Sequence, residues 1–302
     1  DVRHGWNGDG LTTTISPSVG TSIGVLLEHF TEAGESVLLQ PPVFTDFKPL
    51  IRAAKRPRVR SSLRLESGRY NMDFADLEEK IADPSTKAMI LCNPHNPVGR
   101  CWTAAELRQV ANICAANDVF VIADEIHADL VLPGNRFVPF ATAADGTGVV
   151  WAALHGPIKT FGLAGVCDTL LLTDSEEVTD AFRTQSSRLH LTRNNVFALA
   201  AFEAAYTEGG DWLDGFLSDV AENFRLLEES LSNPLAVVAA EATYLAWLDL
   251  RGLGLDVPEL SRWLADSGLA LSPGHWFGRE GAGFARMTMA VAHEAISAAA
   301  DR

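Results

Sequence analysis

The sequence predicts an α/β protein with a doubly wound, mostly parallel sheet and a smaller C-terminal α+β domain. Up to about residue 190, short apolar runs alternate with amphipathic helices, and beyond it a long helical stretch leads into short strands and helices. The chain has 302 residues, of which 47% are hydrophobic, which is enough for two domains with substantial cores. We expect a large domain over residues 1–212 and a small domain over residues 213–302.

Near-continuous apolar runs predict the strands of the large domain. Such runs are typical of strands that are buried on both faces of a sheet. Helices fall between the runs, so the sheet is expected to be mostly parallel and doubly wound, with right-handed crossovers. The runs cover residues 36–42, 88–94, 119–125, 149–154 and 169–173.

Capping signals mark the helices of the large domain. An apolar stripe predicts a helix over residues 19–33 that stops at Gly34. Asp73 is a candidate N-cap for the helix that follows it, and Thr103 and Glu106 form a capping box for a helix that runs to about Asn117.

The C-terminal part has a different pattern. Residues 194–231 predict a long helical segment that is interrupted near Gly209 and Gly210. The small domain is then predicted from four shorter segments, with strands at 243–250, 269–274 and 284–291 and a helix near 257–267.

Charge and composition exclude several classes of function. The net charge of −15 argues against nucleic acid or an anionic membrane as a partner, and there is no run of 18 apolar residues that would span a bilayer. The polar start contains neither a signal peptide nor an initiating Met, so we expect a processed or excised piece, or a first part that lies elsewhere. The four cysteines form no CxxC pair, which favours a reducing cytoplasm: Cys92, Cys101, Cys114 and Cys167.

Chemically capable side chains follow the predicted strands. Because ligands of open parallel sheets bind beyond the carboxyl ends of the strands, these side chains are expected to share one edge. The segment S-P-S-V-G before the first helix offers free N–H groups for an anion. A lysine for an aldehyde, a carboxylate for a pyridine nitrogen, a donor for a ring hydroxyl and a phosphate seat are what pyridoxal phosphate requires. The side chains are Asn93, His95, Asn96, Asp124, Glu125, His127 and Lys159.

Six ordered blocks carry a family resemblance over about residues 10–292. They resemble the cystathionine β-lyase / cysteine C–S lyase branch of the fold-type-I pyridoxal-phosphate enzymes, within the aminotransferase class I/II superfamily. The blocks are LCNPHNPVGRCWTAAEL, VIADEIHADLVLPG, KTFGLAG, AAYTEGGDWLD, TYLAWLDLRGL and LSPGHWFGREGAGFARMTMA.

The resemblance implies a role for each residue of the cofactor site. Lys159 would bind the cofactor aldehyde as a Schiff base and later move protons, which makes it the catalytic residue. Asp124 would pair with the pyridine nitrogen, Asn96 would contact the ring hydroxyl, His127 would lie near that hydroxyl, and Ile126 would press on one face of the ring.

The resemblance also implies how the charged ends of cofactor and substrate are bound. Arg286 would bind the α-carboxylate of an amino-acid substrate as a fork, with Asn96 beside it. The helix amides near Ser18, Val19 and Gly20 would hold the phosphate. No metal is expected, because the histidine of DEIHAD has no second histidine near it.

Each of these residues also has a purely structural explanation. Lys159 alone could be a lysine that buries its stem and exposes its ammonium, Asp124 a strand-end cap, and Asn96 a turn residue between two prolines. Arg286 stands among apolar residues, where a guanidinium is costly without a partner, and a substrate carboxylate would supply one.

The sequence departs from the family pattern near the lysine. Gly156 and Ile158 stand where hydroxyl residues usually help to hold the phosphate, Cys167 replaces an arginine found in many relatives, and Thr21 replaces an aromatic residue that stacks on the ring. Each lost charge-assisted hydrogen bond removes about 1.5–3 kcal/mol, so we expect weaker cofactor binding than usual. The family's N-terminal arm, several dozen residues long, has no counterpart in this sequence.

The resemblance implies α,β-elimination on an S-substituted cysteine such as cystathionine, and a homodimer. An aminotransferase, a lyase domain of a larger assembly-line enzyme that acts on a carrier-bound thioether, and a non-catalytic family member remain as alternatives.

Overall fold

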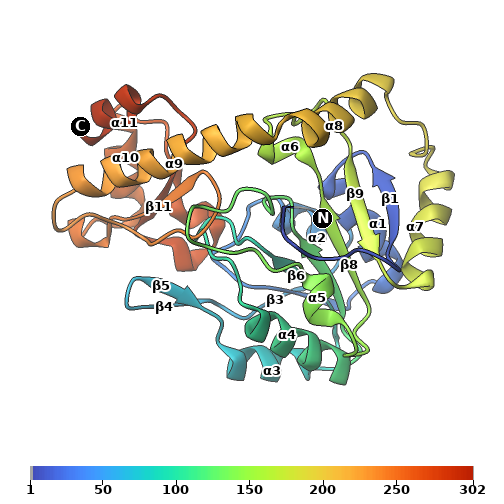
Figure 1. The fold of residues 1–302 in the computed structure, drawn as a ribbon. Coiled ribbons are helices and arrows are strands. Elements are labelled where there is room, and N and C mark those ends of the chain that lie inside the picture. Colours follow the sequence, from blue (N-terminus) through green and yellow to red (C-terminus); the bar gives the residue numbers. More distant parts are fainter. Residues whose placement is uncertain (1–2, 302) are drawn as a thin grey trace.

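The computed structural model describes residues 3–301, and its centre is a seven-stranded sheet (Figure 1). The strand order is β1-β9-β8-β7-β6-β2-β3. The strands from β8 to β3 are parallel, whereas β9 is antiparallel to both β8 and β1. In sheet order they are β1 (Thr12–Ser16), β9 (Thr169–Thr173), β8 (Trp151–His155), β7 (Phe120–Asp124), β6 (Thr86–Cys92), β2 (Ser36–Leu39) and β3 (Arg58–Arg60).

The mostly parallel sheet predicted from the sequence is confirmed, and each of the five apolar runs contains one of its strands. Two strands were not predicted, β1 and β3. The run at 169–173 forms β9, which is antiparallel to β8, so the sheet is mostly and not entirely parallel.

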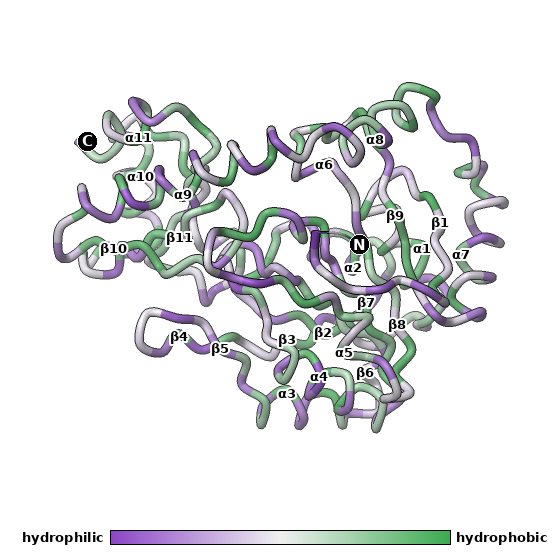
Figure 2. Tube along the Cα trace, in the orientation of Figure 1, coloured by the Kyte–Doolittle hydropathy of each residue, from purple (hydrophilic) through white to green (hydrophobic). Residues whose placement is uncertain are grey.

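Helices cover both faces of the sheet, as the doubly wound prediction requires. On one face α1 (Val19–Phe30), α2 (Phe47–Ala53) and α7 (Glu176–Arg188) pack on the alternate strand residues that include Ile90 and Ile122. On the other face α3 (Phe74–Ile81), α4 (Ala104–Ala116) and α5 (Phe140–Ala144) pack on the set that includes Met89 and Val121. Figure 2 shows the resulting hydrophobic colour along the central strands.

Most helix boundaries agree with the capping signals. The side chain of Asp73 accepts the N–H of Asp76, and Thr103 and Glu106 form the predicted capping box. The predicted end of the first helix at residue 33 is wrong. The helix ends at Phe30, because Thr31 adopts an extended conformation (φ −140°, ψ 150°) and its N–H makes the last helical bond, to the carbonyl of Leu27.

The C-terminal part carries a second, antiparallel sheet in the order β10-β11-β13-β12. Its strands are β10 (Ala236–Val237), β11 (Leu245–Asp249), β12 (Ser272–Pro273) and β13 (Phe284–Thr288). They pack with α9 (Gly210–Ser230), α10 (Val257–Asp266) and α11 (His293–Ala300) around a core of their own. The small α+β unit predicted from the sequence is therefore present.

The two sheets are joined by a helix and by a shared core. The long helix α9 follows α8 (Val196–Glu208) after the predicted interruption at Gly209 and runs from one sheet to the other (Figure 1). The predicted domain boundary at residue 212 falls inside α9, and that division stays a prediction. Trp247 of the small sheet packs into the core of the large one and donates its indole N–H to the hydroxyl of Tyr70 at 3.2 Å.

The remaining elements are short. They are the hairpin β4 (Arg64–Glu66) and β5 (Arg69–Asn71), the turn of helix α6 (Pro157–Thr160), and the 3-10 turns η1 (Arg251–Leu253), η2 (Gly274–Phe277) and η3 (Arg279–Gly281). Within residues 3–301, none of the helices combines the length and the hydropathy that crossing a bilayer would require.

Candidate active site

The carboxyl ends of three neighbouring parallel strands bring the predicted site residues to one edge. β6 ends at Cys92 and is followed by the turn that carries Asn96, β7 ends at Asp124, and β8 leads directly into α6, which carries Lys159. Because these strands run parallel, their ends lie side by side. Lys159 is close enough to Asp124 for its ammonium to lower the pKa of that carboxyl.

Asp124 is a buried carboxylate with one of its two oxygens in a hydrogen bond. It is 4% exposed, and its Oδ1 accepts the N–H of Ile126 at 3.2 Å. Its Oδ2 has no hydrogen-bond donor within residues 3–301. Burial raises the pKa of Asp124 from 3.8 to about 6, against the opposing effects of the Ile126 N–H and of Lys159. A buried carboxyl with one open oxygen is suited to accept a charged N–H group.

Asn96 and Arg286 form a contact between the two sheets. Arg286, on β13, donates from Nη1 to Oδ1 of Asn96 at 3.0 Å. Its guanidinium lies over the ring of Phe277, 4.7 Å from the ring centre. Burial lowers the pKa of Arg286, but a guanidinium stays charged at neutral pH. The other N–H groups of Arg286 and the amide NH₂ of Asn96 make no hydrogen bond to any residue that the structure describes, so both can bind a ligand.

His127 and Ile126 follow Asp124 in the same buried segment, and both are 4% exposed. Burial, with the positive charges of Lys159 and Arg286, lowers the pKa of His127 to about 3, so the imidazole is neutral near pH 7. Its ring lies 6.3 Å from that of Tyr244, edge to face. The sequence prediction missed Tyr244, although the block TYLAWLDLRGL contains it.

The predicted phosphate seat lies at the N-terminus of α1. Ser18 is the N-cap, and its hydroxyl accepts the N–H of Thr21 at 3.0 Å and bonds the Thr21 hydroxyl at 2.9 Å. Val19 and Gly20 are the first residues of the helix, where backbone N–H groups point outward and can bind an anion. At the position of the family's stacking ring, Thr21 therefore contributes a hydroxyl group to this helix end.

The packing near Lys159 explains why glycine stands at position 156 in place of the family's usual hydroxyl residue. A Cβ atom at Gly156 would lie 3.2 Å from Cα of Thr169 on β9, which is closer than most such contacts. The hydroxyl of Thr169 donates to the carbonyl of Ser16, so this same region adjoins the start of α1. Cys167 is 5% exposed, and burial raises the pKa of its thiol, so this side chain brings no charge to a phosphate.

Glu125 and His155 form a buried pair that the sequence prediction did not assign. Oε2 of Glu125 lies 2.6 Å from Nε2 of His155, and Oε1 accepts the N–H of Phe140 at 2.7 Å and the amide of Asn93 at 3.3 Å. The pair ties the end of β7 to the end of β8 and so fixes the spacing between Asp124 and the lysine segment.

Asp129 is a second buried carboxylate that supports the site. Its Oδ1 lies 2.9 Å from Nε2 of His4, and its Oδ2 accepts the hydroxyls of Thr160 and Tyr206, each at 3.2 Å. Burial raises the pKa of Asp129, but the bonds from His4 and Tyr206 outweigh it, and the net result is a lowered pKa. Thr160 is next to Lys159, so Asp129 anchors the lysine-bearing turn to distant segments.

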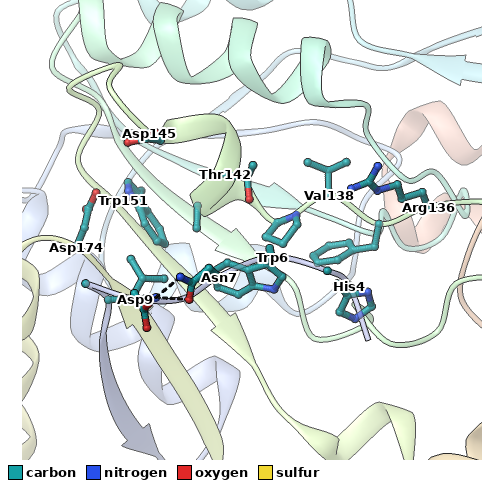
Figure 3. A pocket seen from close by; sticks show the side chains of 16 residues that line it. His4, Trp6, Asn7, Asp9, Arg136, Val138, Thr142, Asp145, Trp151 and Asp174 are labelled. Atoms are coloured by element: carbon teal, nitrogen blue, oxygen red, sulfur yellow. Dashed lines mark hydrogen bonds between the residues drawn. The ribbon is translucent and has the colours of Figure 1, made fainter. Parts of the chain in front are cut away.

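The segment before β1 lies against this support. Figure 3 shows His4 and Trp6 beside the loop that carries Arg136 and Val138, around a cavity of about 570 Å³. The contact of His4 with Asp129 is part of this packing. Within residues 3–301, no group of three or more His, Cys, Asp and Glu side chains is placed to hold a metal ion.

The groups that remain open match the requirements of pyridoxal phosphate. Oδ2 of Asp124 can accept the pyridine N–H, the Asn96 amide can donate to the ring hydroxyl, and the helix start at Ser18 can hold the phosphate. The ammonium of Lys159 makes no hydrogen bond or ion pair within the described part of the chain, so it is available for an aldehyde. The residues therefore fit this cofactor, while their individual roles stay predictions.

Fold and site together define an α/β enzyme of the pyridoxal-phosphate class with an aminotransferase-like architecture. The family model for aminotransferase class I and II matches residues 11–302, and the chain belongs to this family.

Three relatives show which branch of the family the chain resembles. It is 37% identical to cystathionine beta-lyase PatB of Bacillus subtilis (strain 168), over 94% of this chain and 75% of that protein. It is 31% identical to protein MalY of Escherichia coli (strain K12), over 92% of this chain and 72% of that protein. Cystalysin from Treponema denticola, which contains pyridoxal 5′-phosphate, superposes with a TM-score of 0.94 at 27% identity, over 99% of this chain and 77% of that one.

These relatives confirm the resemblance to the C–S lyase branch that the six sequence blocks indicated. The family and the structural neighbour with bound pyridoxal phosphate support pyridoxal phosphate as the cofactor of this chain, as expected from the sequence.

Proposed function

We propose that this protein is a pyridoxal-phosphate-dependent C–S β-lyase. It cleaves an S-substituted cysteine, such as cystathionine, to a thiol, pyruvate and ammonia by α,β-elimination. The observation that carries the proposal is the grouping of Lys159, Asp124 and the Asn96–Arg286 pair at one sheet edge. The similarity to cystathionine beta-lyase PatB favours elimination over the other reactions that such a site permits.

Binding of the substrate begins at its carboxylate. The guanidinium of Arg286 has open N–H groups beside Asn96, and a substrate carboxylate can accept two of them in parallel. The ring of Phe277 packs against the flat face of this guanidinium and limits its movement. The amino acid is therefore held by one end, with its Cα turned toward the edge that carries Lys159.

Proton transfer is the part of the reaction that Lys159 performs. Bound pyridoxal phosphate supplies an electron sink for the pair left when a proton leaves Cα. Asp124 keeps the ring nitrogen of the cofactor protonated, through its open oxygen. The amine of Lys159 takes the proton from Cα and can return it to a departing group.

The bond changes balance without an oxidant or a reductant. The Cα–H bond breaks, a Cα–Cβ double bond forms, and the Cβ–S bond breaks as the thiolate leaves and takes up a proton. The released three-carbon enamine then takes up water and yields pyruvate and ammonia.

The test combines the purified protein with pyridoxal phosphate and L-cystathionine or another S-substituted cysteine. Thiol is measured with a chromogenic disulfide, and pyruvate by coupled lactate dehydrogenase. We expect equal amounts of both products. Lys159→Ala should abolish them and should prevent borohydride from fixing the cofactor to the chain. Lys87→Ala, a change of a partly exposed lysine on β6, is the matched control and should leave both intact.

Other outcomes identify the other candidates. A 2-oxo acid formed without thiol would mean an aminotransferase. Turnover only with a carrier-bound thioether would mean a lyase domain of an assembly-line enzyme. Cofactor binding without any turnover would mean a non-catalytic member of the family.

The state of assembly and the compartment are part of the same proposal. Val196, Phe197 and Leu199 expose apolar side chains on α8, which favours a second copy of the chain as their cover. The four cysteines are buried and unpaired, which suits a reducing cytoplasm. Sedimentation of the wild type and of Phe197→Asp tests the dimer, since only the wild type should sediment as one.

A further inference from the structure

A cluster of positive charge lies away from the candidate active site, beside β3. This strand forms one edge of the large sheet and is labelled in Figure 1. The cluster lines a cleft of about 520 Å³, and among residues 3–301 no acidic residue is part of its wall. Such a concentration stands out in a chain with a net charge of −15. We call it the cationic cleft, and its charged or titratable lining residues are Lys48, Arg58, Arg60, His275 and Arg279.

Two arginines of the cationic cleft have no partner in the described part of the chain. Arg58 and Arg60 alternate on β3, so their side chains lie on the same face of the strand. Both are exposed, and neither makes a hydrogen bond or an ion pair with any residue in the range 3–301. Two unneutralised guanidinium groups held side by side repel each other, and an anion bound between them would remove that repulsion.

Lys48 adds a third positive charge to the cationic cleft from a different element. It stands on α2, and its ammonium donates to the carbonyl of Trp276. Burial lowers the pKa of Lys48, and Arg58 and Arg60 lower it further, while Glu280 acts in the opposite direction. Glu280 offsets only part of this charge: its Oε1 lies 3.4 Å from Nε of Arg279, whereas Arg58 and Arg60 make no ion pair within residues 3–301.

The cationic cleft adjoins the site that is expected to bind the substrate carboxylate. Val43, in the wall of the cleft, donates its N–H to the carbonyl of Phe277 at 3.0 Å. The ring of Phe277 in turn supports Arg286. One segment of chain therefore separates the cleft from the guanidinium of the active site, and the two are distinct places.

Protection of the sheet edge explains only part of this arrangement. Charged residues on an edge strand prevent another strand from pairing with it, which would account for Arg58 and Arg60. It does not account for Lys48 on α2 and Arg279 on η3, which converge on the same space from other elements.

We propose that the cationic cleft binds the phosphate or pyrophosphate group of a small molecule. Guanidinium groups bind phosphate oxygens in pairs, and several cations together match a group that carries two or more negative charges. The cleft is larger than a phosphate ion requires, which leaves room for an organic remainder. The proposal does not depend on the lyase activity, because the cleft stands apart from Lys159.

The experiment titrates inorganic pyrophosphate into the holoenzyme by calorimetry at low ionic strength, with the cofactor already in its own seat. We expect saturable binding that weakens as salt is added. The double variant R58A/R60A should bind about a hundredfold more weakly, since each of the two lost charge-assisted bonds is worth about tenfold. Succinate, which carries two negative charges on carboxylates and has no phosphate oxygens, should bind more weakly than pyrophosphate.

Two controls locate the site. R183A/R188A removes the same charge from exposed positions on α7, which packs near the opposite edge of the sheet, and should bind like the wild type. Arg286→Ala should also retain binding. The proposal fails if the wild type does not bind pyrophosphate, or if it binds succinate as tightly. It also fails if R58A/R60A binds as well as the wild type, or if both double variants lose affinity equally. Loss of binding in Arg286→Ala would likewise overturn it.

Discussion

Replacing Asp124 with asparagine is expected to stabilise the cofactor-free protein while it impairs the holoenzyme. The folded protein buries this carboxyl at the end of β7, and burial raises its pKa from 3.8 to about 6. Above that pH the folded protein carries a negative charge on Asp124, although burial favours the neutral carboxylic acid there. The rise is about two pH units at about 1.4 kcal/mol each, so the charge costs about 3 kcal/mol near pH 8.

The sign follows from proton binding. The folded carboxyl holds its proton more tightly than the unfolded one, so its contribution to stability is full below about pH 3.8 and is lost as the pH rises through about 6. Asparagine does not titrate and keeps an oxygen for the N–H of Ile126. The cofactor-free variant should therefore exceed the wild type by about 3 kcal/mol near pH 8, and by less than about 1 kcal/mol near pH 4.

Urea unfolding of the cofactor-free wild type, Asp124→Asn and the exposed control Asp180→Asn, at both pH values, measures this difference. In the holoenzyme, turnover of Asp124→Asn should fall by about a hundredfold, because an amide cannot form the charge-assisted bond to the cofactor nitrogen. The reasoning is refuted if Asp124→Asn is less stable than the wild type near pH 8, or if its advantage is the same at both pH values.

Three further substitutions test other parts of the site. Arg286→Lys keeps the charge but loses the fork, so KM for an S-substituted cysteine should rise about tenfold with little change in the cofactor spectrum; an unchanged KM would contradict a carboxylate-binding role. Asp129→Asn should cost about 2–3 kcal/mol near pH 7, because it replaces an acceptor of three hydrogen bonds. Since the pKa of Asp129 is lowered, that contribution is lost as the pH falls through the lowered value, so the variant should show a weaker acid dependence of urea unfolding, and an unaltered dependence would count against the assignment. Gly156→Ser should lower the thermal midpoint, at a cost of about 1–3 kcal/mol from crowding against Thr169, and an equal or higher midpoint would show that β9 can give way.

Much of the large sheet could be predicted from the sequence, because buried strands leave a local signal. The apolar runs and the capping box at Thr103 need only neighbouring residues to be recognised. The antiparallel edge is different, since β1 pairs with β9 across more than half of the chain. Nothing within residues 169–173 distinguishes a strand that returns beside β8 from one that crosses over.

The candidate site divides in the same way. Lys159, Asp124 and Asn96 follow predicted strands, so their common edge could be inferred before any coordinates. The hydrogen bonds that position these residues could not be inferred in this way. Asp129 receives its hydrogen bonds from His4, Thr160 and Tyr206, which come from three separate segments, and a carboxylate in the block DEIHAD gives no sign of such distant donors.

The end of the first helix shows a third limit. The apolar stripe continues past Phe30, and Gly34 is a suitable residue for a helix end. Thr31 instead adopts an extended conformation, and Gly34 adopts a positive φ of 97° in the turn that follows. The backbone conformation of a single residue is information that the hydrophobic pattern does not contain.

The bond between Arg286 and Asn96 has a consequence for how such enzymes change over time. Every group expected to touch the cofactor comes from the first 160 residues, whereas the anchor for the incoming amino acid comes from β13, near the other end of the chain. Mutations around β13 are therefore expected to change how tightly the amino acid binds without weakening cofactor binding. Asn96, as the residue that meets both halves, is where such drift would be most constrained.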